Sequence, residues 1–377
     1  MADTSKPEFE QLDSADKIQA YLSSITDTSF PEAFRSPVSI AALAGGSGNG
    51  VHRLTYNTTN ATSNATPATI VLKHTIPYVF TVNGAKVVWD TWPFGILAQR
   101  EVPSTEFVKI PKVYWVDEVK RVMLMEDTGL KSLNLKNLLL SEKIPDNRVF
   151  AKIGEELGKY LAILHSWGRS TDIIEKYENK DSRVIASWRT FGRLEDSLAK
   201  TYPDLPESLK LKVKTYCEEE KVKALTGKDL VIMGDFWTGN CMVNLDDAGE
   251  LESLYIVDWE LIRPGDAATE LSQMLAEVWE GGEFGQSPSA KAAAKDLSTG
   301  LCSAYKHGAG SLPENLLKDV MLAAGAHVVV WAPIGFAAYG DAQKFKTAQD
   351  KASQFMWEAF GESVNSQDWG LAALGNL

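Results

Sequence analysis

The chain has 377 residues, of which 44% are hydrophobic and 23% are charged, as expected for a globular protein with a substantial core. Its formal net charge of -12 at pH 7 argues against nucleic acid and anionic membrane surfaces as partners. Three widely spaced cysteines, together with a polar and acidic N-terminal segment, predict a cytoplasmic protein with reduced thiols.

The first third of the chain is rich in predicted strands. Apolar residues recur at helical spacing over residues 14–25, which predicts an opening amphipathic helix. The segments that follow are a glycine-turned hairpin, a β-branched strand, a short helix and two further strands, over residues 37–56, 69–79, 94–102, 109–117 and 121–127. These elements make residues 1–126 a small β-rich region.

The remainder of the chain is predicted to be mainly helical. Apolar side chains share one helical face over residues 148–168, and a second such stripe begins at Ala267. Short apolar runs at 231–243 and 252–260 are predicted strands between the helices. The sequence therefore predicts an α+β protein with a β-rich lobe, a connector near residues 125–130 and a larger helical lobe over residues 127–377.

The longest strongly apolar stretch is "VVVWAPIGFAAY", over residues 328–339. Pro333 interrupts it, and it is shorter than the roughly 20 residues that a membrane-spanning helix needs. We expect no membrane partner, and the protein to be a monomer or a homodimer.

Two features of the β-rich region suggest contacts with phosphate. Gly45, Gly46, Ser47, Gly48 and Asn49 form a glycine-rich turn that could bring backbone N–H groups close to phosphate oxygens. An ordinary hairpin turn uses the same residues.

Lys73 lies centrally in a predicted strand with apolar neighbours. A lone strand lysine is usually a solvated edge residue, but Lys73 could instead pair with the α/β-phosphates of a nucleotide while Glu101 fixes its position.

The strongest chemical signal is "VIMGDFWTGNCMV", over residues 231–243. Asp235 is followed five residues later by Asn240, and Asp258 and Glu260 end the next predicted strand. Phosphoryl transfer needs a carboxylate that receives the alcohol's proton and oxygen ligands that hold Mg²⁺ against the phosphates. An Asp/Asn pair on a tight turn, with a strand-end acid one hairpin later, supplies that set. Each element alone is typical of a turn or a strand end; their order favours a phosphotransferase.

The chain resembles the aminoglycoside phosphotransferase/choline kinase superfamily, which is related to the protein kinases. The resemblance runs from about Ala42 to the C-terminal helices and is carried by "GGSGNGVHRL", "IVLKH", "AQRE", "VMLMED", "YLAILH", "MGDFWTGNCMV" and "YIVDWELIRPGDAATEL". Within the superfamily the chain is most similar to the methylthioribose-kinase-like branch, which includes the fungal 4-hydroxytryptamine kinases. The resemblance implies a bilobal, protein-kinase-like fold.

The resemblance also implies roles for individual residues. Lys73 and Glu101 would form the phosphate-anchoring ion pair, and Asp235 would be the general base. The remaining roles fall on two sets: Met125, Glu126 and Asp127 for the adenine-binding connector, and Asn240, Asp258 and Glu260 for the metal. ATP and Mg²⁺ are the implied cofactors.

Two departures from the family pattern bear on function. Met233 stands where most of the superfamily has a histidine, and as an adaptable apolar residue it can fill the same space. The substitution leaves open a catalytically silent, nucleotide-binding pseudokinase. The stretch "AAGAHVVVWAPIGFAAYG" also lacks the paired arginine of methylthioribose kinases, which argues against methylthioribose itself as the acceptor.

The expected acceptor is a small hydroxylated molecule. Candidates for an aromatic wall are Trp279, Trp331, Phe336 and Tyr339, with Glu277 or Glu280 as an acid for an amine, although aromatic residues in helices are also common core residues. Trp237, two residues after Asp235, could contact the substrate or brace the turn. A hydroxytryptamine-like aromatic amine is the first expectation, and methylthioribose or a choline- or ethanolamine-type alcohol is the alternative. His165 is expected to be a buried, hydrogen-bonded structural residue.

Overall fold

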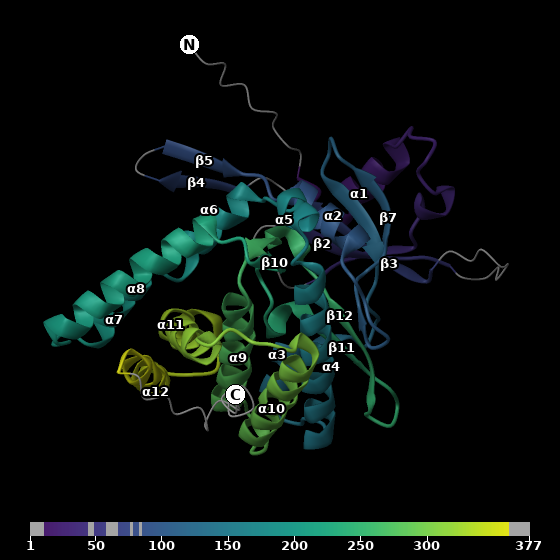
Figure 1. Ribbon diagram of the computed structural model, residues 1–377. Coiled ribbons are helices and arrows are strands. Elements are labelled where there is room, and N and C mark those ends of the chain that lie inside the picture. Colours follow the sequence, from purple (N-terminus) through teal and green to yellow (C-terminus); the bar gives the residue numbers. More distant parts are fainter. Residues whose placement is uncertain (1–10, 44–48, 58–66, 76–77, 83–84, 362–377) are drawn as a thin grey trace, which may run out of the picture. The chain divides into compact units, whose positions relative to one another are not determined.

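The computed structural model describes residues 11–43, 49–57, 67–75, 78–82 and 85–361 (Figure 1). The chain forms two compact units. The first contains Met1–Arg100 and Pro111–Leu130, and the second contains Glu101–Ile110 and Lys131–Leu377. The segment 101–110 belongs to the second unit because its strand β6 (Val108–Lys109) pairs with a strand of that unit.

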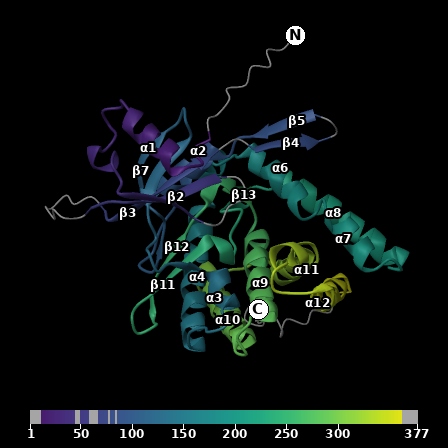
Figure 2. The same cartoon turned by 180° about the vertical axis from the view of Figure 1, so that it is seen from behind.

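The first unit is built on a five-stranded antiparallel sheet (Figure 2). Its strands, in spatial order, are β1 (Ser39–Ala42), β2 (Asn49–Thr55), β3 (Thr69–Thr75), β8 (Val122–Glu126) and β7 (Val113–Asp117). Strand β3 is central, and its β-branched and apolar side chains are buried, as strand propensity favours. The predicted hairpin and the two later strands are confirmed.

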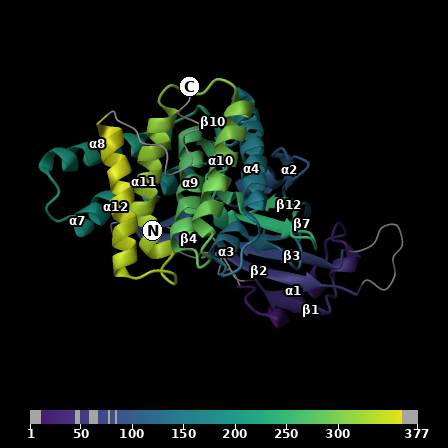
Figure 3. The same ribbon diagram turned by 90° about the horizontal axis from the view of Figure 1, so that it is seen from below.

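Helix α1 (Ala15–Ser24) covers one face of this sheet (Figure 3). The side chain of Ser14 caps its first turn by accepting a hydrogen bond from the Lys17 amide. Ile18 and Leu22 point from the helix into a buried cluster with strand residues such as Leu72. The amphipathic pattern over residues 14–25 therefore predicted both the helix and its buried face.

Four short elements complete the first unit. Their bounds are 3-10 helix Glu32–Phe34, β4 (Tyr78–Val82), β5 (Ala85–Trp89) and α2 (Trp92–Glu101), the last of which crosses into the second unit. Strands β4 and β5 pair with each other as an antiparallel hairpin. Helix α2 packs Trp92 and Ile96 against Met123 of β8, which gives the unit a second small buried cluster.

The second unit is mainly helical. Its helices are α3 (Leu135–Leu140), α4 (Asn147–Trp167), α5 (Thr171–Lys176), α6 (Lys180–Arg189), α7 (Leu194–Thr201), α8 (Glu207–Thr226), α9 (Ala267–Phe284), α10 (Ala290–Ala309), α11 (Leu316–Gly335) and α12 (Ala342–Phe360). Helices α4 and α10 lie side by side, as do α9 and α11 and also α11 and α12 (Figures 1 and 3). Gly154 and Gly158 of α4 face the backbone of α10, so the two helices approach closely.

Two small sheets hold the segments that carry the predicted site. One has the order β6–β12–β11–β9, with β12 (Leu251–Ile256), β11 (Cys241–Leu245) and β9 (Leu133–Asn134). The other pairs β10 (Leu230–Ile232) with β13 (Arg263–Gly265). Strands β11 and β12 form the antiparallel hairpin that the sequence predicts between Asn240 and Asp258.

The predicted α+β, kinase-like fold with a β-rich N-terminal part and a mainly helical C-terminal part is confirmed. The contacts define a boundary between Leu130 and Lys131, and the predicted division after residue 126 stays a prediction. Helix α11 is longer than the apolar stretch noted in the sequence and includes Pro333. It is long and apolar enough to cross a membrane by length and composition, but 61% of its apolar window is buried within the structure.

Candidate active site

The turn that carries Asp235 follows strand β10 and depends on a glycine. Gly234 has a φ of +82°, and a Cβ at this position would overlap the Arg263 guanidinium and the Leu261 carbonyl. Arg263 Nη1 donates hydrogen bonds to the carbonyl oxygens of Gly234 (3.2 Å) and Leu261 (3.3 Å). Burial lowers the pKa of Arg263 to about 10, so the guanidinium stays charged at neutral pH. The backbone just before Asp235 is therefore tightly held.

Glu270 of helix α9 supports the same turn from the other side. Its carboxylate accepts hydrogen bonds from the backbone N–H groups of Met233 and Gly234, each at 2.9 Å. His165 Nε2 lies 3.3 Å from the same carboxylate, and His165 Nδ1 lies 2.8 Å from the Tyr305 hydroxyl. His165 is thus the buried, hydrogen-bonded residue that the sequence predicted. The Met233 side chain is fully buried, so it fills space while its backbone is held by Glu270.

Three side chains converge on the Asp235 carboxylate. Oδ1 accepts hydrogen bonds from Arg189 Nη1 at 2.6 Å and from Gln273 Nε2 at 2.8 Å. Oδ2 accepts from Asn240 Nδ2 at 3.2 Å, and the same amide nitrogen reaches the Asp235 carbonyl oxygen at 3.0 Å. The predicted Asp/Asn pair is therefore brought together in one turn. Its neighbours hold the carboxylate in one orientation.

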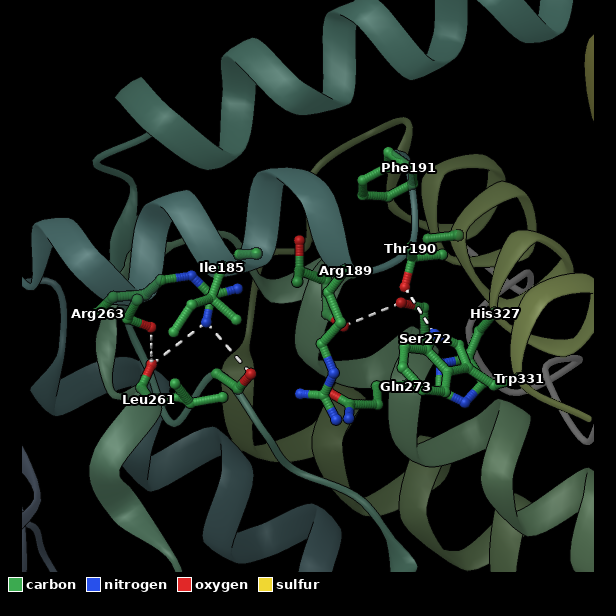
Figure 4. Close-up of a pocket in the computed structure, with 15 residues that line it drawn as sticks. Ile185, Arg189, Thr190, Phe191, Leu261, Arg263, Ser272, Gln273, His327 and Trp331 are labelled. Atoms are coloured by element: carbon green, nitrogen blue, oxygen red, sulfur yellow. Dashed lines mark hydrogen bonds between the residues drawn. The ribbon is translucent and has the colours of Figure 1, made fainter. Parts of the chain in front are cut away.

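A pocket within the second unit is lined by Gly234, the residue before Asp235, and by Arg189 and Gln273, which donate to the Asp235 carboxylate (Figure 4). Arg189 reaches into it from the end of α6 toward Gln273 of α9, while His327 and Trp331 of α11 lie together on the far wall. The Arg189 guanidinium carbon is 5.3 Å from the centre of the Trp331 ring, and Trp331 Nε1 donates to Thr190 Oγ1 at 3.1 Å. The pocket thus combines aromatic rings with hydrogen-bonding groups, which suits a small polar ligand with an apolar part.

Asn240 is also connected to the segment that carries Asp258. The Val257 N–H donates to the Asn240 carbonyl oxygen at 3.0 Å, and Cys241 pairs with Ile256 in the β11–β12 hairpin. Asp258 has left-handed backbone angles, with a φ of 69°, and it begins the 3-10 helix Trp259–Leu261. A non-glycine residue in this region is uncommon and recurs at functional sites. The structure places Asn240 and Asp258 within one hydrogen-bonded corner.

Glu260 lies two residues after Asp258 and is buried. Its carbonyl oxygen, like that of Ile262, accepts a hydrogen bond from Asn179 Nδ2 at 3.1 Å. Asn240 commits its amide nitrogen to Asp235, so its oxygen is the atom that it can offer to a cation. An asparagine oxygen with the carboxylates of Asp258 and Glu260 would be an oxygen-only donor set, the kind that Mg²⁺ prefers, and the metal role of these three residues stays a prediction.

Lys73 lies in the central strand of the first unit, not at a solvated edge. It pairs with Val51 on one side and Met123 on the other, and the residue is only 8% exposed. Glu101, at the end of α2, accepts hydrogen bonds from Lys176 Nζ at 2.6 Å and from the Tyr177 hydroxyl at 3.4 Å. The ion pair between Lys73 and Glu101 stays a prediction.

The predicted adenine-binding connector, Met125 to Asp127, spans the end of strand β8. Met125 and Glu126 are the last two residues of strand β8, and Asp127 follows them. Burial raises the pKa of Asp127, but hydrogen bonds from Arg53 and from the Gly129 amide lower it by a larger amount. The pKa of Asp127 therefore lies below the usual value. Arg53 Nε and Nη2 contact the Asp127 carboxylate at 2.5 and 2.9 Å. Asp127 is therefore an ion-paired anchor of the connector.

The glycine-rich turn lies largely outside the described residues. Gly45, Gly46, Ser47 and Gly48 are not described, and of Asn49 only the backbone, at the start of β2, is described. The predicted contact of these residues with phosphate stays a prediction.

The three candidate tryptophans occupy different environments. Trp331 lines the pocket beside Asp235, whereas Trp237 and Trp279 are not among the described residues that line it. The ring of Trp237 lies where a Cβ at Gly239 would be, and Lys136 Nζ is 5.1 Å from its centre. Trp279 is buried in α9. Trp237 thus packs against the turn, and the substrate role of the three tryptophans stays a prediction.

Arg189, Gln273 and Glu270 were not predicted from the sequence. They lie 46, 38 and 36 residues from their partners in the turn, on helices whose packing decides the contact. One sequence feature could have indicated Glu270, because it occurs within "GDAATEL", in the same motif as Asp258. No sequence motif indicated Arg189 or Gln273.

The β-rich N-terminal part, the mainly helical C-terminal part and the turn with the Asp235/Asn240 pair together define the class of kinase-like phosphotransferases. Comparison with known families matches residues 94–299 to the phosphotransferase enzyme family (APH). Because the match covers more than half of the chain, the protein belongs to this family, and it is a small-molecule kinase by enzyme class.

Known relatives point to the same branch as the sequence motifs. The 4-hydroxytryptamine kinase of Psilocybe cubensis is 24% identical over 318 residues, which cover 79% of this chain and 82% of the relative. The methylthioribose kinase of Geobacillus kaustophilus (strain HTA426) is 25% identical over 231 residues, 55% of this chain and 54% of the relative. The predicted resemblance to both is confirmed.

Among solved structures, a candidate aminoglycoside phosphotransferase of Ralstonia eutropha JMP134 has a similar fold. The alignment has a TM-score of 0.53, covers 93% of this chain and 99% of the other, and shows 14% identity. At this identity the likeness establishes the fold alone.

Proposed function

We propose that the protein is an ATP-dependent O-phosphotransferase that phosphorylates a hydroxyl group of a small metabolite. The observation that carries the proposal is the corner in which Asp235 and Asn240 are hydrogen-bonded to each other and Asn240 is hydrogen-bonded to the residue before Asp258. Such a corner offers a proton acceptor and metal ligands within one small region, and phosphoryl transfer requires both.

In this proposal Asp235 is the general base. The acceptor hydroxyl donates its proton to the Asp235 carboxylate as its oxygen bonds to the γ-phosphorus of ATP, and ADP leaves with the electrons of the broken bond. Asn240 positions Asp235 through its amide nitrogen. Arg189 and Gln273 already occupy Oδ1, so a bound acceptor would displace one of these two donors or approach Oδ2.

Asn240, Asp258 and Glu260 would hold Mg²⁺. The ion, when bound, would neutralise the charge of the β- and γ-phosphates. The buried Lys73 would contact the α- and β-phosphates, with Glu101 orienting it. The glycine-rich turn and the Met125–Asp127 connector would contact the phosphates and the adenine.

The acceptor we propose first is a hydroxytryptamine-like aromatic amine. Its support is the match to 4-hydroxytryptamine kinase over most of both chains, together with the rings of Trp331 and His327 on the pocket wall. Glu277 and Glu280 are not among the described residues that line this pocket, so an amine would not meet them at its surface. A methylthioribose-type sugar or a choline- or ethanolamine-type alcohol is the alternative acceptor.

Other parts of the proposal follow from composition and family. The three cysteines are buried and unpaired, in keeping with reduced thiols in a cytoplasmic protein. The net charge of -12 favours no nucleic-acid partner. A monomer or a homodimer is proposed, with a small hydroxylated molecule as the partner.

The test is a screen for acceptor-dependent release of ADP. Purified protein, ATP and Mg²⁺ are incubated with hydroxylated tryptamines, thiosugars, and choline or ethanolamine analogues. We expect ADP release well above the rate without acceptor for one class, most of all for the tryptamines. Nucleotide binding without ADP release for any class would favour the silent pseudokinase that Met233 suggests.

A further inference from the structure

A second group of ionisable side chains lies between helices α9 and α11. Glu277 and Glu280 project from α9, and His327 projects from α11. One ligand atom from each residue lies within 4.8 Å of the others, and all three residues are buried. His327 Nε2 is 3.3 Å from Glu277 Oε1 and 3.8 Å from Glu280 Oε2. The imidazole thus faces both carboxylates.

Glu280 stands out because it is fully buried and unsatisfied. Neither of its carboxylate oxygens has a hydrogen-bond partner among the described residues, and the residue is 0% exposed. A buried carboxylate without partners costs several kcal/mol, so a structure that keeps one usually supplies a proton or a cation. Burial, reinforced by the nearby charge of Glu277, raises the pKa of Glu280 well above the usual value.

The two oxygens of Glu277 have different surroundings. Oε2 lies 3.4 Å from both Lys136 Nζ and Thr238 Oγ1, whereas Oε1 faces His327. One oxygen is thus held by neighbouring donors while the other points toward His327 and Glu280. This is how a metal-binding carboxylate is commonly oriented by its neighbours.

We propose that Glu277, Glu280 and His327 form a site for a divalent transition-metal ion such as Zn²⁺ or Mn²⁺. An imidazole with two carboxylates suits these ions, whereas Mg²⁺ prefers oxygen ligands alone. A tetrahedral ion with ligands at about 2.1 Å separates neighbouring ligand atoms by roughly 3.4 Å. The separations from His327 Nε2 to the two carboxylates, 3.3 and 3.8 Å, lie on either side of that value and close to it.

A divalent ion would compensate the buried charges of Glu277 and Glu280 better than a proton on Glu280 does. A proton on Glu280 neutralises that carboxylate, but it does not join Glu280 to Glu277 and His327. A divalent ion takes one oxygen from each glutamate and the Nε2 of His327 together. His327 also lines the pocket beside Asp235, so the cluster lies next to a space through which an ion could enter.

The site would link the acceptor pocket to the catalytic turn. Glu277 contacts Thr238 of the turn, and His327 stands beside Trp331 on the pocket wall. A bound ion would therefore fix helix α11 against α9 and the turn. The inference does not depend on the proposed kinase reaction, because none of its ligands belongs to the Asp235, Asn240 and Asp258 corner.

The experiment titrates untagged full-length protein, first freed of metal with a chelator, with Co²⁺ in the absence of nucleotide and Mg²⁺. Co²⁺ in a four-coordinate site with a histidine ligand absorbs visible light much more strongly than Co²⁺ in an all-oxygen, octahedral site. Zn²⁺ is then added to displace it. We expect one equivalent of strongly absorbing Co²⁺ in the wild type, and a decrease in affinity of at least about tenfold in Glu280→Gln and His327→Gln.

Two control variants locate the ion. Glu283→Gln changes an acid on the same helix outside the cluster, and Asp258→Asn removes a ligand of the proposed Mg²⁺ site. Both should bind Co²⁺ as the wild type does. The buried cysteines do not compete, because all three thiols are inside the protein.

Thermal unfolding gives a second readout. Without metal, Glu280→Gln should melt at or above the temperature of the wild type, because a buried carboxyl group is replaced by a neutral amide of the same shape. Zn²⁺ should raise the melting temperature of the wild type and leave that of Glu280→Gln unchanged. The proposal is overturned if the wild type binds no strongly absorbing Co²⁺, or if Glu280→Gln and His327→Gln bind it with unchanged affinity.

Discussion

Glu270 holds the backbone of the catalytic turn without taking part in the proposed chemistry. Its carboxylate accepts the N–H groups of Met233 and Gly234 and also faces His165, while the residue is 1% exposed. Hydrogen bonds from backbone donors to a buried carboxylate are stronger than those between neutral groups. The conformation of the turn before Asp235 therefore depends on the charge of Glu270.

Replacing Glu270 with glutamine should destabilise the protein and slow turnover. A glutamine keeps the shape, but its NH₂ group would face one of the two backbone N–H donors, which leaves a buried donor unsatisfied. We expect a loss of about 2–3 kcal/mol in the free energy of unfolding and a lower kcat with little change in nucleotide affinity. Denaturant unfolding and steady-state kinetics measure these effects.

Glu283→Gln on the same helix is the matched control, because Glu283 forms ion pairs with Lys291 and Lys351 nearer the surface. It should change stability by less than about 1 kcal/mol. Equal stability and equal kcat for Glu270→Gln and the wild type would show that the turn does not need this carboxylate.

At the residue scale, site residues on one turn could be predicted from the sequence, whereas residues that meet only in the folded chain could not. Asp235 and Asn240 could be predicted because their spacing on one turn is visible in the chain. Gly234 was visible as part of the same turn. The donors Arg189 and Gln273 come from helices α6 and α9, and their contact with Asp235 depends on how those helices pack.

At the element scale, long periodic segments could be predicted and short strands could not. Helix α4 and strand β3 have patterns that their own residues determine. Strands β6 and β9 have two residues each, and they exist because they pair with β12 and β11. Pairing of this kind depends on distant residues, so local propensity carries little information about it.

Helices α8, α9 and α11 bring several charges together around Glu220. Burial raises the pKa of Glu220 to about 7, although Lys223, whose Nζ lies 3.5 Å from its carboxylate, acts against this. Asp266 before α9 and Asp319 of α11 raise the pKa further. Glu220 therefore keeps its proton in the folded protein to a higher pH than in the unfolded chain.

The free energy of unfolding should fall as the pH rises from about 4.5 to about 7, and Glu220→Gln should remove part of this fall. Below about pH 4.5 the carboxyl is protonated in both states, so it has no effect; between 4.5 and 7 the unfolded chain releases the proton first and is favoured. The difference amounts to at most about 3 kcal/mol. Denaturant unfolding of both proteins between pH 4.5 and 8 measures it.

Glu219→Gln is the control, because Glu219 is exposed on the same helix. Its free energy of unfolding should follow that of the wild type at every pH. If the difference between the wild type and Glu220→Gln does not change with pH, burial does not shift the pKa of Glu220.

At the scale of the whole molecule, the fold and the family define the enzyme class but leave the acceptor open. The kinase-like fold supports phosphoryl transfer to many kinds of small molecule. The pocket that we propose for the acceptor is lined by residues from three helices and the segment after α6, among them Arg189, Thr190, Gln273, His327 and Trp331. Because the sequence shows these residues far apart, it could predict the reaction from the catalytic turn but not the shape of the pocket.

The proposed reaction requires Asp235 to accept the proton of the acceptor hydroxyl. The most direct measurement compares acceptor-dependent ADP release by the wild type, by Asp235→Asn and by the exposed control Asp229→Asn, together with ATP binding by each. We expect Asp235→Asn to lose at least about 10²-fold in kcat while its ATP affinity stays within about twofold, and Asp229→Asn to equal the wild type. Equal rates of ADP release by Asp235→Asn and the wild type would contradict it.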